Sequence, residues 1–196
     1  MKKIFTLTFL ILALFATTCS AEKSSPANDI KILCSAVIYG DEASLQRMGM
    51  TYEEYEKFFI SEFSKSLAKS SGINFSEAQV TKINNALISV FRRTEISTET
   101  ISQNSDTATV KVTVSQFEKF DDNTIMAYLP ENISSMSYDE KVDAFVDAMA
   151  AALQNLRVVG SGEITVKCEY ISNGDMWVPI EARQFGNLLS TKIFNL

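Results

Sequence analysis

The stretch GEITVKCEYISNGDMWVPI, residues 162–180, decides the fold. Polar and apolar residues alternate before and after Asn173-Gly174, a pattern typical of two antiparallel strands joined by a two-residue turn whose central residues tolerate positive φ. The turn fixes the register, so the expected facing pairs are Tyr170 with Trp177 and Cys168 with Pro179, on one face with Ile164 and Val166. Because Pro179 has no N–H to donate, its strand should lie at a sheet edge or end there.

A second hairpin is expected earlier in the chain. The segment TATVKVTVSQF, residues 107–117, alternates Ala108, Val110, Val112 and Val114 with polar residues, which predicts a half-buried strand. Residues 94–102, rich in Thr and Ile, are its expected antiparallel partner across the loop QNSD. The sequence leaves the register of this pair open.

Three segments carry the signature of a helix start: MTYEEY at 50–55, FSEAQV at 75–80 and MSYDEK at 136–141. Each places Ser or Thr three residues before Glu or Gln, so the two side chains can satisfy each other's free backbone N–H groups. They predict helices over 52–70, 77–91 and 138–157.

The two ends of the chain should also be helical. Asn28 or Asp29 is expected to cap a first helix that ends at Gly40, with apolar residues at Ile30, Leu33, Cys34, Val37 and Ile38. Asp41 should cap a shorter helix containing Leu45 and Met48. A C-terminal helix is expected to turn Phe185, Leu188 and Leu189 inward. This order of elements predicts an α+β fold, with an antiparallel sheet of two hairpins packed on N-terminal helices and a long helix between the hairpins.

The first residues resemble a bacterial export signal, because Lys2 and Lys3 precede an apolar run over 4–16. Two cleavage sites stay open. Cleavage after Ala21 would discard Cys19, whereas cleavage before Cys19 would leave it as a lipidation site. The signal is therefore 1–21, or 1–18 if Cys19 carries lipid, followed by a polar tether over 22–28 and a single domain over 29–196.

Composition excludes several classes of protein. Without the leader, 16 basic residues face 24 acidic ones, a net charge of −8, so nucleic acid and anionic lipid headgroups are not expected partners. The chain has no histidine, which removes the commonest general base and zinc ligand, and no metal or cofactor is expected. After export, Cys34 and Cys168 are either a disulfide or two buried thiols.

The segment DIKILCSAVIYGDEASLQRMGMTYEEYEKFF at 29–59, the hairpins and the late NGDMWVPI together resemble an uncharacterised family of bacterial predicted lipoproteins, a domain of unknown function. The resemblance implies a cystatin-like or nuclear-transport-factor-2-like cone fold and a place in the cell envelope. It brings no assigned catalytic residues with it.

The sequence leaves two functions open. One is a non-catalytic, exported module that binds a small hydrophobic ligand or a peptide in a pocket lined by Tyr39, Phe117, Tyr170 and Trp177, although such aromatic residues are more often core. The other is an envelope assembly protein that uses a contact patch at Ile171 and Met176 on the opposite sheet face. An isomerase or dehydratase working with Asp and Tyr is the less favoured third reading. Any membrane attachment is expected only through lipid at Cys19.

Overall fold

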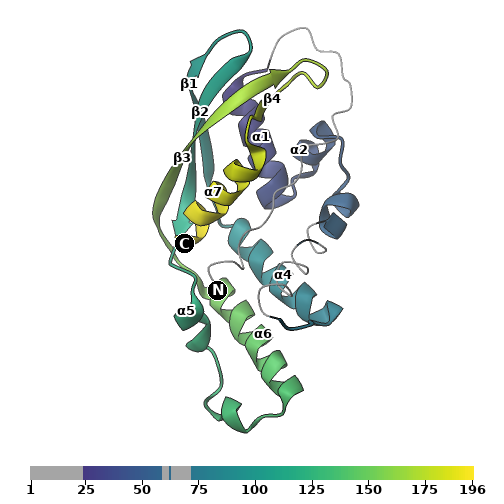
Figure 1. Cartoon of the computed structure of the whole chain (residues 1–196), viewed down its shortest axis with the longest axis vertical. Coiled ribbons are helices and arrows are strands. Elements are labelled where there is room, and N and C mark those ends of the chain that lie inside the picture. Colours follow the sequence, from purple (N-terminus) through teal and green to yellow (C-terminus); the bar gives the residue numbers. More distant parts are fainter. Residues whose placement is uncertain (1–23, 59–61, 63–71) are drawn as a thin grey trace.

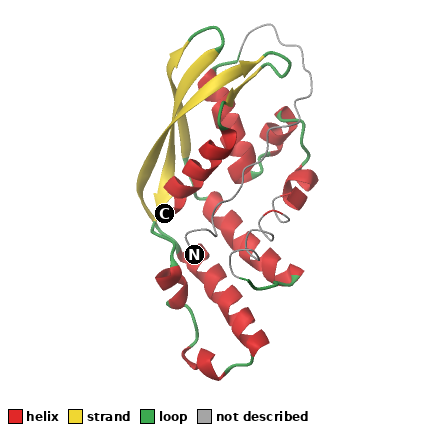
Figure 2. Ribbon diagram, viewed as in Figure 1, coloured by secondary structure: helices red, strands yellow, loops and turns green. Residues whose placement is uncertain are grey.

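The protein was analysed as a computed structural model that describes residues 24–58, 62 and 72–196. Its fold is α+β, as predicted, with helices beside a four-stranded antiparallel sheet and below one end of it (Figures 1 and 2). The elements in chain order are α1 (Pro26–Tyr39), α2 (Glu42–Arg47), α4 (Glu77–Phe91), β1 (Ile96–Gln103), β2 (Thr107–Phe117), α5 (Asp122–Met126), a 3-10 helix (Glu131–Ser135), α6 (Tyr138–Asn155), β3 (Val158–Ile171), β4 (Met176–Pro179) and α7 (Ala182–Phe194).

The strands follow one another across the sheet in the order β1-β2-β3-β4. At its centre Val110 pairs with Val166, and both side chains point to the same, buried face. The register that the sequence left open pairs Thr98 with Val112, and it shifts at a bulge between Thr100 and Ser102. The opposite sheet face carries mostly Thr, Lys and Glu and is partly exposed, as expected of an antiparallel sheet covered on one side.

The register predicted for the second hairpin is confirmed, since Tyr170 pairs with Trp177 and β4 is an edge strand that ends at Pro179. The predicted turn is wrong. The residue with positive φ is Asp175, at 45°, and neither Asn173 nor Gly174 adopts such a conformation. Contacts from elsewhere in the chain explain the difference, because Arg47 Nη2 donates to the C=O of Asp175 at 3.3 Å and Ser24 Oγ lies 3.4 Å from the same oxygen.

The first helix begins earlier than predicted. Its N-cap is Ser25, whose side chain accepts from the N–H of Asn28 at 3.2 Å, rather than Asn28 or Asp29. Pro26 follows in the first turn, where its missing N–H costs nothing. The last three residues of the predicted tether, 26–28, are therefore helical. At the other end Gly40 closes α1 with φ 61°, as predicted, and a Cβ there would lie 2.8 Å from Cε1 of Tyr55.

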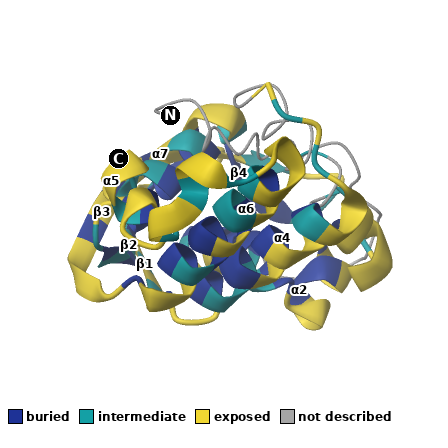
Figure 3. Cartoon of the chain, turned by 90° about the horizontal axis from the view of Figure 1, so that it is seen from below, coloured by how far each residue is buried: buried dark blue, intermediate teal, exposed yellow. Residues whose placement is uncertain are grey.

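The other predicted helix starts agree with the structure. Ser76 and Ser137 form complete capping boxes at α4 and α6, and Asp41 caps α2. In the segment predicted as a helix over 52–70, residues 52–58 and 62 are helical, and the remainder lies outside the described residues. The buried faces of α4 and α6 meet, with exposed residues outside them (Figure 3).

Arg93 ties this helical pair to the sheet. Its guanidinium donates to the C=O of Leu156 at 2.7 Å and of Leu153 at 3.2 Å, so it satisfies carbonyl groups at the C-terminal end of α6. The same group stands 5.3 Å from the ring centre of Phe117, at the end of β2. One side chain thus holds α4, α6 and β2 together.

Strand β3 is longer than predicted and much longer than β4. It begins at Val158 rather than Gly162, because β2 extends to Phe117 and pairs with it along this length. β4 pairs only with Cys168 to Ile171. The edge of β3 that faces away from β2 carries β4 only at one end. Within the part of the chain that the structure describes, no strand lies beside this edge from Val158 to Lys167.

The glycines of β3 give a matched test of how α7 packs on the sheet. A Cβ at Gly162 would lie 2.9 Å from Cβ of Lys192, whereas one at Gly160 would meet nothing within 4 Å. Gly162→Ala should therefore lower the free energy of unfolding by about 1–3 kcal/mol, through strain at the helix–strand contact. Gly160→Ala should leave it unchanged or raise it by about 0.4–1 kcal/mol. Urea unfolding of both variants measures this, and equal effects would contradict the close contact.

Candidate functional site

Helix α7 crosses the buried face of the sheet and touches it most closely towards its C-terminal end. There Lys192 lies over Gly162, and the C=O of Phe194 accepts from the N–H of Phe120 at 3.4 Å. Phe185, Leu189 and Ile193 are buried along one side of the helix. At its other end, near residues 180–188, the helix leaves a groove between itself and β3.

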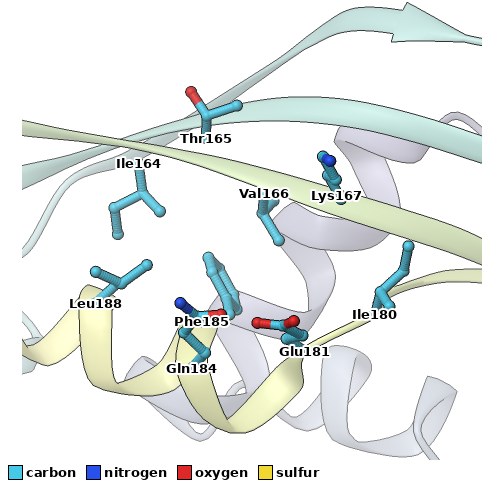
Figure 4. Close-up of a pocket in the computed structure, with 9 residues that line it drawn as sticks. All are labelled: Ile164, Thr165, Val166, Lys167, Ile180, Glu181, Gln184, Phe185 and Leu188. Carbon is cyan, nitrogen blue, oxygen red and sulfur yellow. The ribbon is translucent and has the colours of Figure 1, made fainter.

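The groove has a volume of about 320 Å³. It is lined by Ile164, Thr165, Val166, Lys167, Ile180, Glu181, Gln184, Phe185 and Leu188 (Figure 4). The first four are consecutive residues of β3. Because successive strand side chains point to opposite faces, four in a row can line one groove only when the edge of the strand forms its wall.

The floor of the groove is apolar and its rim is polar. Ile164 and Val166 point from β3 towards α7, and Phe185 points back between them, while Thr165 points away (Figure 4). Ile180 and Leu188 stay 49% and 40% exposed, so both present apolar surface to an occupant. Leu188, predicted to point inward with Phe185, lies on the sheet side of α7 but lines the groove and is not buried. Lys167, Glu181 and Gln184 add polar groups, an arrangement that suits an apolar ligand held in a set orientation.

A more open hollow adjoins the groove along the first turns of α7. It measures about 520 Å³ and shares Ile180, Glu181 and Gln184 with the groove. Asn187 lines this hollow, and its buried side-chain oxygen accepts no hydrogen bond from any described residue. A buried amide oxygen without a donor carries a desolvation cost.

The four aromatic residues predicted to line a pocket lie elsewhere. Trp177 and Phe117 are fully buried in the core. Tyr170 packs on Trp177 with ring centres 5.4 Å apart and donates its O–H to Asp175, and the O–H of Tyr39 donates to the C=O of Thr94. None of the four lines the groove described here.

Asp29 is the centre of a buried polar network at the opposite end of β4. The carboxylate is fully buried and accepts from the backbone N–H of Trp177 at 2.9 Å and from the hydroxyl of Ser24. Its other oxygen lies 3.6 Å from Nη2 of Arg47. The indole N–H of Trp177 donates to the C=O of Ser24, also at 2.9 Å. The network fixes the start of the described chain to β4, and burial raises the pKa of Asp29 despite these donors.

Cys34 on α1 and Cys168 on β3 are free thiols, both buried. Burial raises the pKa of each thiol to about 12, and the neighbouring Cys168 also raises that of Cys34. Both thiols are thus protonated at neutral pH, which makes them poor nucleophiles.

The contact patch predicted at Ile171 and Met176 is not present. Met176 is 1% exposed, and all four residues of β4 are buried. The neighbouring turn contacts Ser24 and Arg47 through the C=O of Asp175, while Ser172 and Asn173 stay exposed.

Sequence reasoning missed most of the groove residues, although one signal was available. The strand before Asn173 has a longer alternating run than the segment after it, which stops at Pro179. A strand that outruns its hairpin partner must expose an edge or find another cover. Among the described residues, no group of His, Cys, Asp or Glu side chains could hold a metal ion. No helix in this part of the chain is long and apolar enough to cross a membrane.

Comparisons with known proteins support the fold. The chain resembles the crystal structure of ycdA from Bacillus subtilis subsp. subtilis str. 168, described there as a "putative lipoprotein", with a TM-score of 0.66 and 17% sequence identity. The similarity covers 84% of this chain but 55% of the other, so this chain spans about half the length of that protein. No protein-family model matches the sequence, and no curated protein matches it.

The network at Asp29 gives a prediction about pH. Burial raises the pKa of Asp29 in the folded state, so the folded protein binds this proton more tightly than the unfolded chain does. The free energy of unfolding therefore increases as the pH falls through the folded pKa, and it decreases as the pH rises through it. Asp29→Asn keeps an acceptor for Trp177 but cannot titrate. The melting temperature of the wild type relative to Asp29→Asn should therefore rise between pH 7 and pH 4.

The exposed Asp139→Asn serves as the control, since it removes a carboxylate that the fold leaves in water. A wild-type curve parallel to that of Asp29→Asn over this pH range would show that Asp29 does not titrate as its burial requires.

Proposed function

We propose that this protein is an exported, non-catalytic binding module of the cell envelope, which holds an apolar ligand in the groove between β3 and α7. The observation that carries the proposal is the groove itself, with an apolar floor of Ile164, Val166 and Phe185 and a polar rim. Pockets of this kind obtain affinity from apolar contact and orientation from a few polar groups. Nothing in the rim supplies a histidine or a reactive thiol, so binding alone is proposed.

Export and envelope location rest on the N-terminal pattern of Lys2, Lys3 and the apolar run over 4–16. The fold similarity to a protein described as a putative lipoprotein is in keeping with this. We also assign the core to the cystatin-like arrangement. The support is that α1 packs against an antiparallel sheet whose strands follow one another in chain order.

Ligand binding is tested with N-phenyl-1-naphthylamine, an uncharged apolar dye that fluoresces when it leaves water. Titration should give saturable binding. Leu188→Lys should weaken it by about tenfold or more, because it places a charge on the apolar rim of the groove.

The matched control is Leu196→Lys. Leu196 is 45% exposed, close to the 40% of Leu188, but it lies beyond the far end of α7. Both variants should melt near the wild-type temperature, since neither removes a buried side chain. Dye binding that is absent in the wild type, or equal in both variants, would overturn the proposed site.

The proposal that the protein is exported is tested by the intact mass of the full chain recovered from bacterial fractions. A diacylglyceryl-modified chain that begins at Cys19, found with membranes, or an unmodified chain that begins at Glu22 would each support export, by lipid attachment or by release. A chain that retains residues 1–18 in the cytoplasmic fraction would overturn it. Repeating the measurement with reductant tests Cys34 and Cys168, because two free thiols leave the mass unchanged.

A further inference from the structure

The edge of β3 that faces away from β2 carries, beyond the end of β4, backbone groups that pair with no strand among the described residues. The N–H of Ile180 donates to the C=O of Lys167 at 3.0 Å, which shows that the polar backbone groups of Lys167 point to the β4 side. In an antiparallel strand this direction alternates from residue to residue. The N–H and C=O groups of Thr165 and Glu163 therefore point the same way as those of Lys167, away from β2.

No strand that the structure describes pairs with these groups. β4 ends at Pro179, opposite Cys168, and the chain turns after Ile180 into α7. Among the described residues, none forms a hydrogen bond with the backbone of Thr165 or Glu163 on this side. Farther along the edge, Val158 and Val159 are 52% and 56% exposed. Native sheets usually cover or shorten such an edge, because it is a template for another strand.

We propose that the occupant of the groove is an extended peptide segment of a partner protein, which adds to β3 as a further antiparallel strand. The proposal rests on the groove of the proposed function and names its ligand class. The segment would extend the line of β4 beyond Pro179, so the new interface is continuous with the existing β3–β4 ladder. Strand addition of this kind draws affinity from main-chain hydrogen bonds and specificity from alternating side chains.

The geometry defines the sequence pattern of the peptide. Residues that face each other across an antiparallel pair place their side chains on the same face. The peptide residue opposite Thr165 therefore directs its N–H to β3 and its side chain to the outer face of the sheet, where Thr165 points (Figure 4). Its two neighbours point their side chains towards Phe185 and Leu188. The expected ligand has small apolar residues at every second position and polar residues between them.

The charges at the groove favour a segment without a strong net charge. Lys167 and Glu181, of opposite sign, both line it. A hydrocarbon chain would use the floor but would leave the strand edge unbonded.

The test uses the acetylated and amidated peptide KVTVTVTK and two N-methylated forms, with binding to the full chain followed by calorimetry. Methylation at the threonines removes the N–H groups that should bond to β3, so binding should weaken by about tenfold or more. Methylation at the valines alters N–H groups that point away from β3 and should weaken binding much less. Leu188→Lys should weaken binding of the parent peptide, and Leu196→Lys should not.

The outcomes separate this inference from the proposed function. If the dye binds but the parent peptide does not, or if both methylated forms bind equally, ligand binding in the groove is supported and strand addition is wrong. If methylation at the valines is the harmful change, addition is parallel and the antiparallel proposal is overturned. If neither dye nor peptide binds, the proposed function fails as well. A dimer that is seen in sedimentation and is dissociated by Leu188→Lys would identify a second copy of the chain as the occupant. It would overturn the proposal that a partner's peptide segment binds there.

Discussion

The hydrogen bond from the N–H of Ile180 to the C=O of Lys167 marks the point where the chain leaves the sheet. Beyond it β3 continues to Val158 with no strand among the described residues paired to that edge, while the chain enters α7. The groove is the direct result of this mismatch in strand length. A longer β4 would have paired the edge and closed the groove, so the early end of one short strand leaves the opening through which the proposed ligand would enter.

Two sets of contacts fix the positions of β4 and α7, and with them the part of β3 that β4 does not pair. At one end of β4, the buried carboxylate of Asp29 and the C=O of Ser24 bind the backbone and the indole of Trp177. At the far end of α7, the helix packs on Gly162, where there is no side chain to keep it away. The apolar lining of the groove is thus an extension of the core that the helix does not fully cover.

The local parts of this structure could be predicted from the sequence. Alternation and turn length placed Tyr170 opposite Trp177, and this register holds although the turn adopts another backbone shape. Capping boxes located the starts of α4 and α6 because they depend only on neighbouring residues. The turn itself was mispredicted because Ser24 and Arg47 hold Asp175 from distant parts of the chain.

The site was harder to predict for the same reason. Aromatic residues suggested a pocket, yet Trp177 is satisfied by Ser24, more than a hundred positions earlier, and is core. Leu188 fits the inward stripe of an amphipathic helix, but its exposure depends on the distance between α7 and β3. No local pattern encodes that distance.

The close contact between Lys192 and Gly162 also bears on how α7 could adjust to an occupant of the groove. A helix packed tightly at one end and loosely at the other can tilt about the tight end while its remaining contacts adjust. Such a tilt changes the width of the groove near Phe185 and Leu188 but leaves its position along β3 unchanged. Under the proposed strand addition, such a tilt would let the groove admit side chains of different size, with Gly162, outside the groove lining, as the pivot.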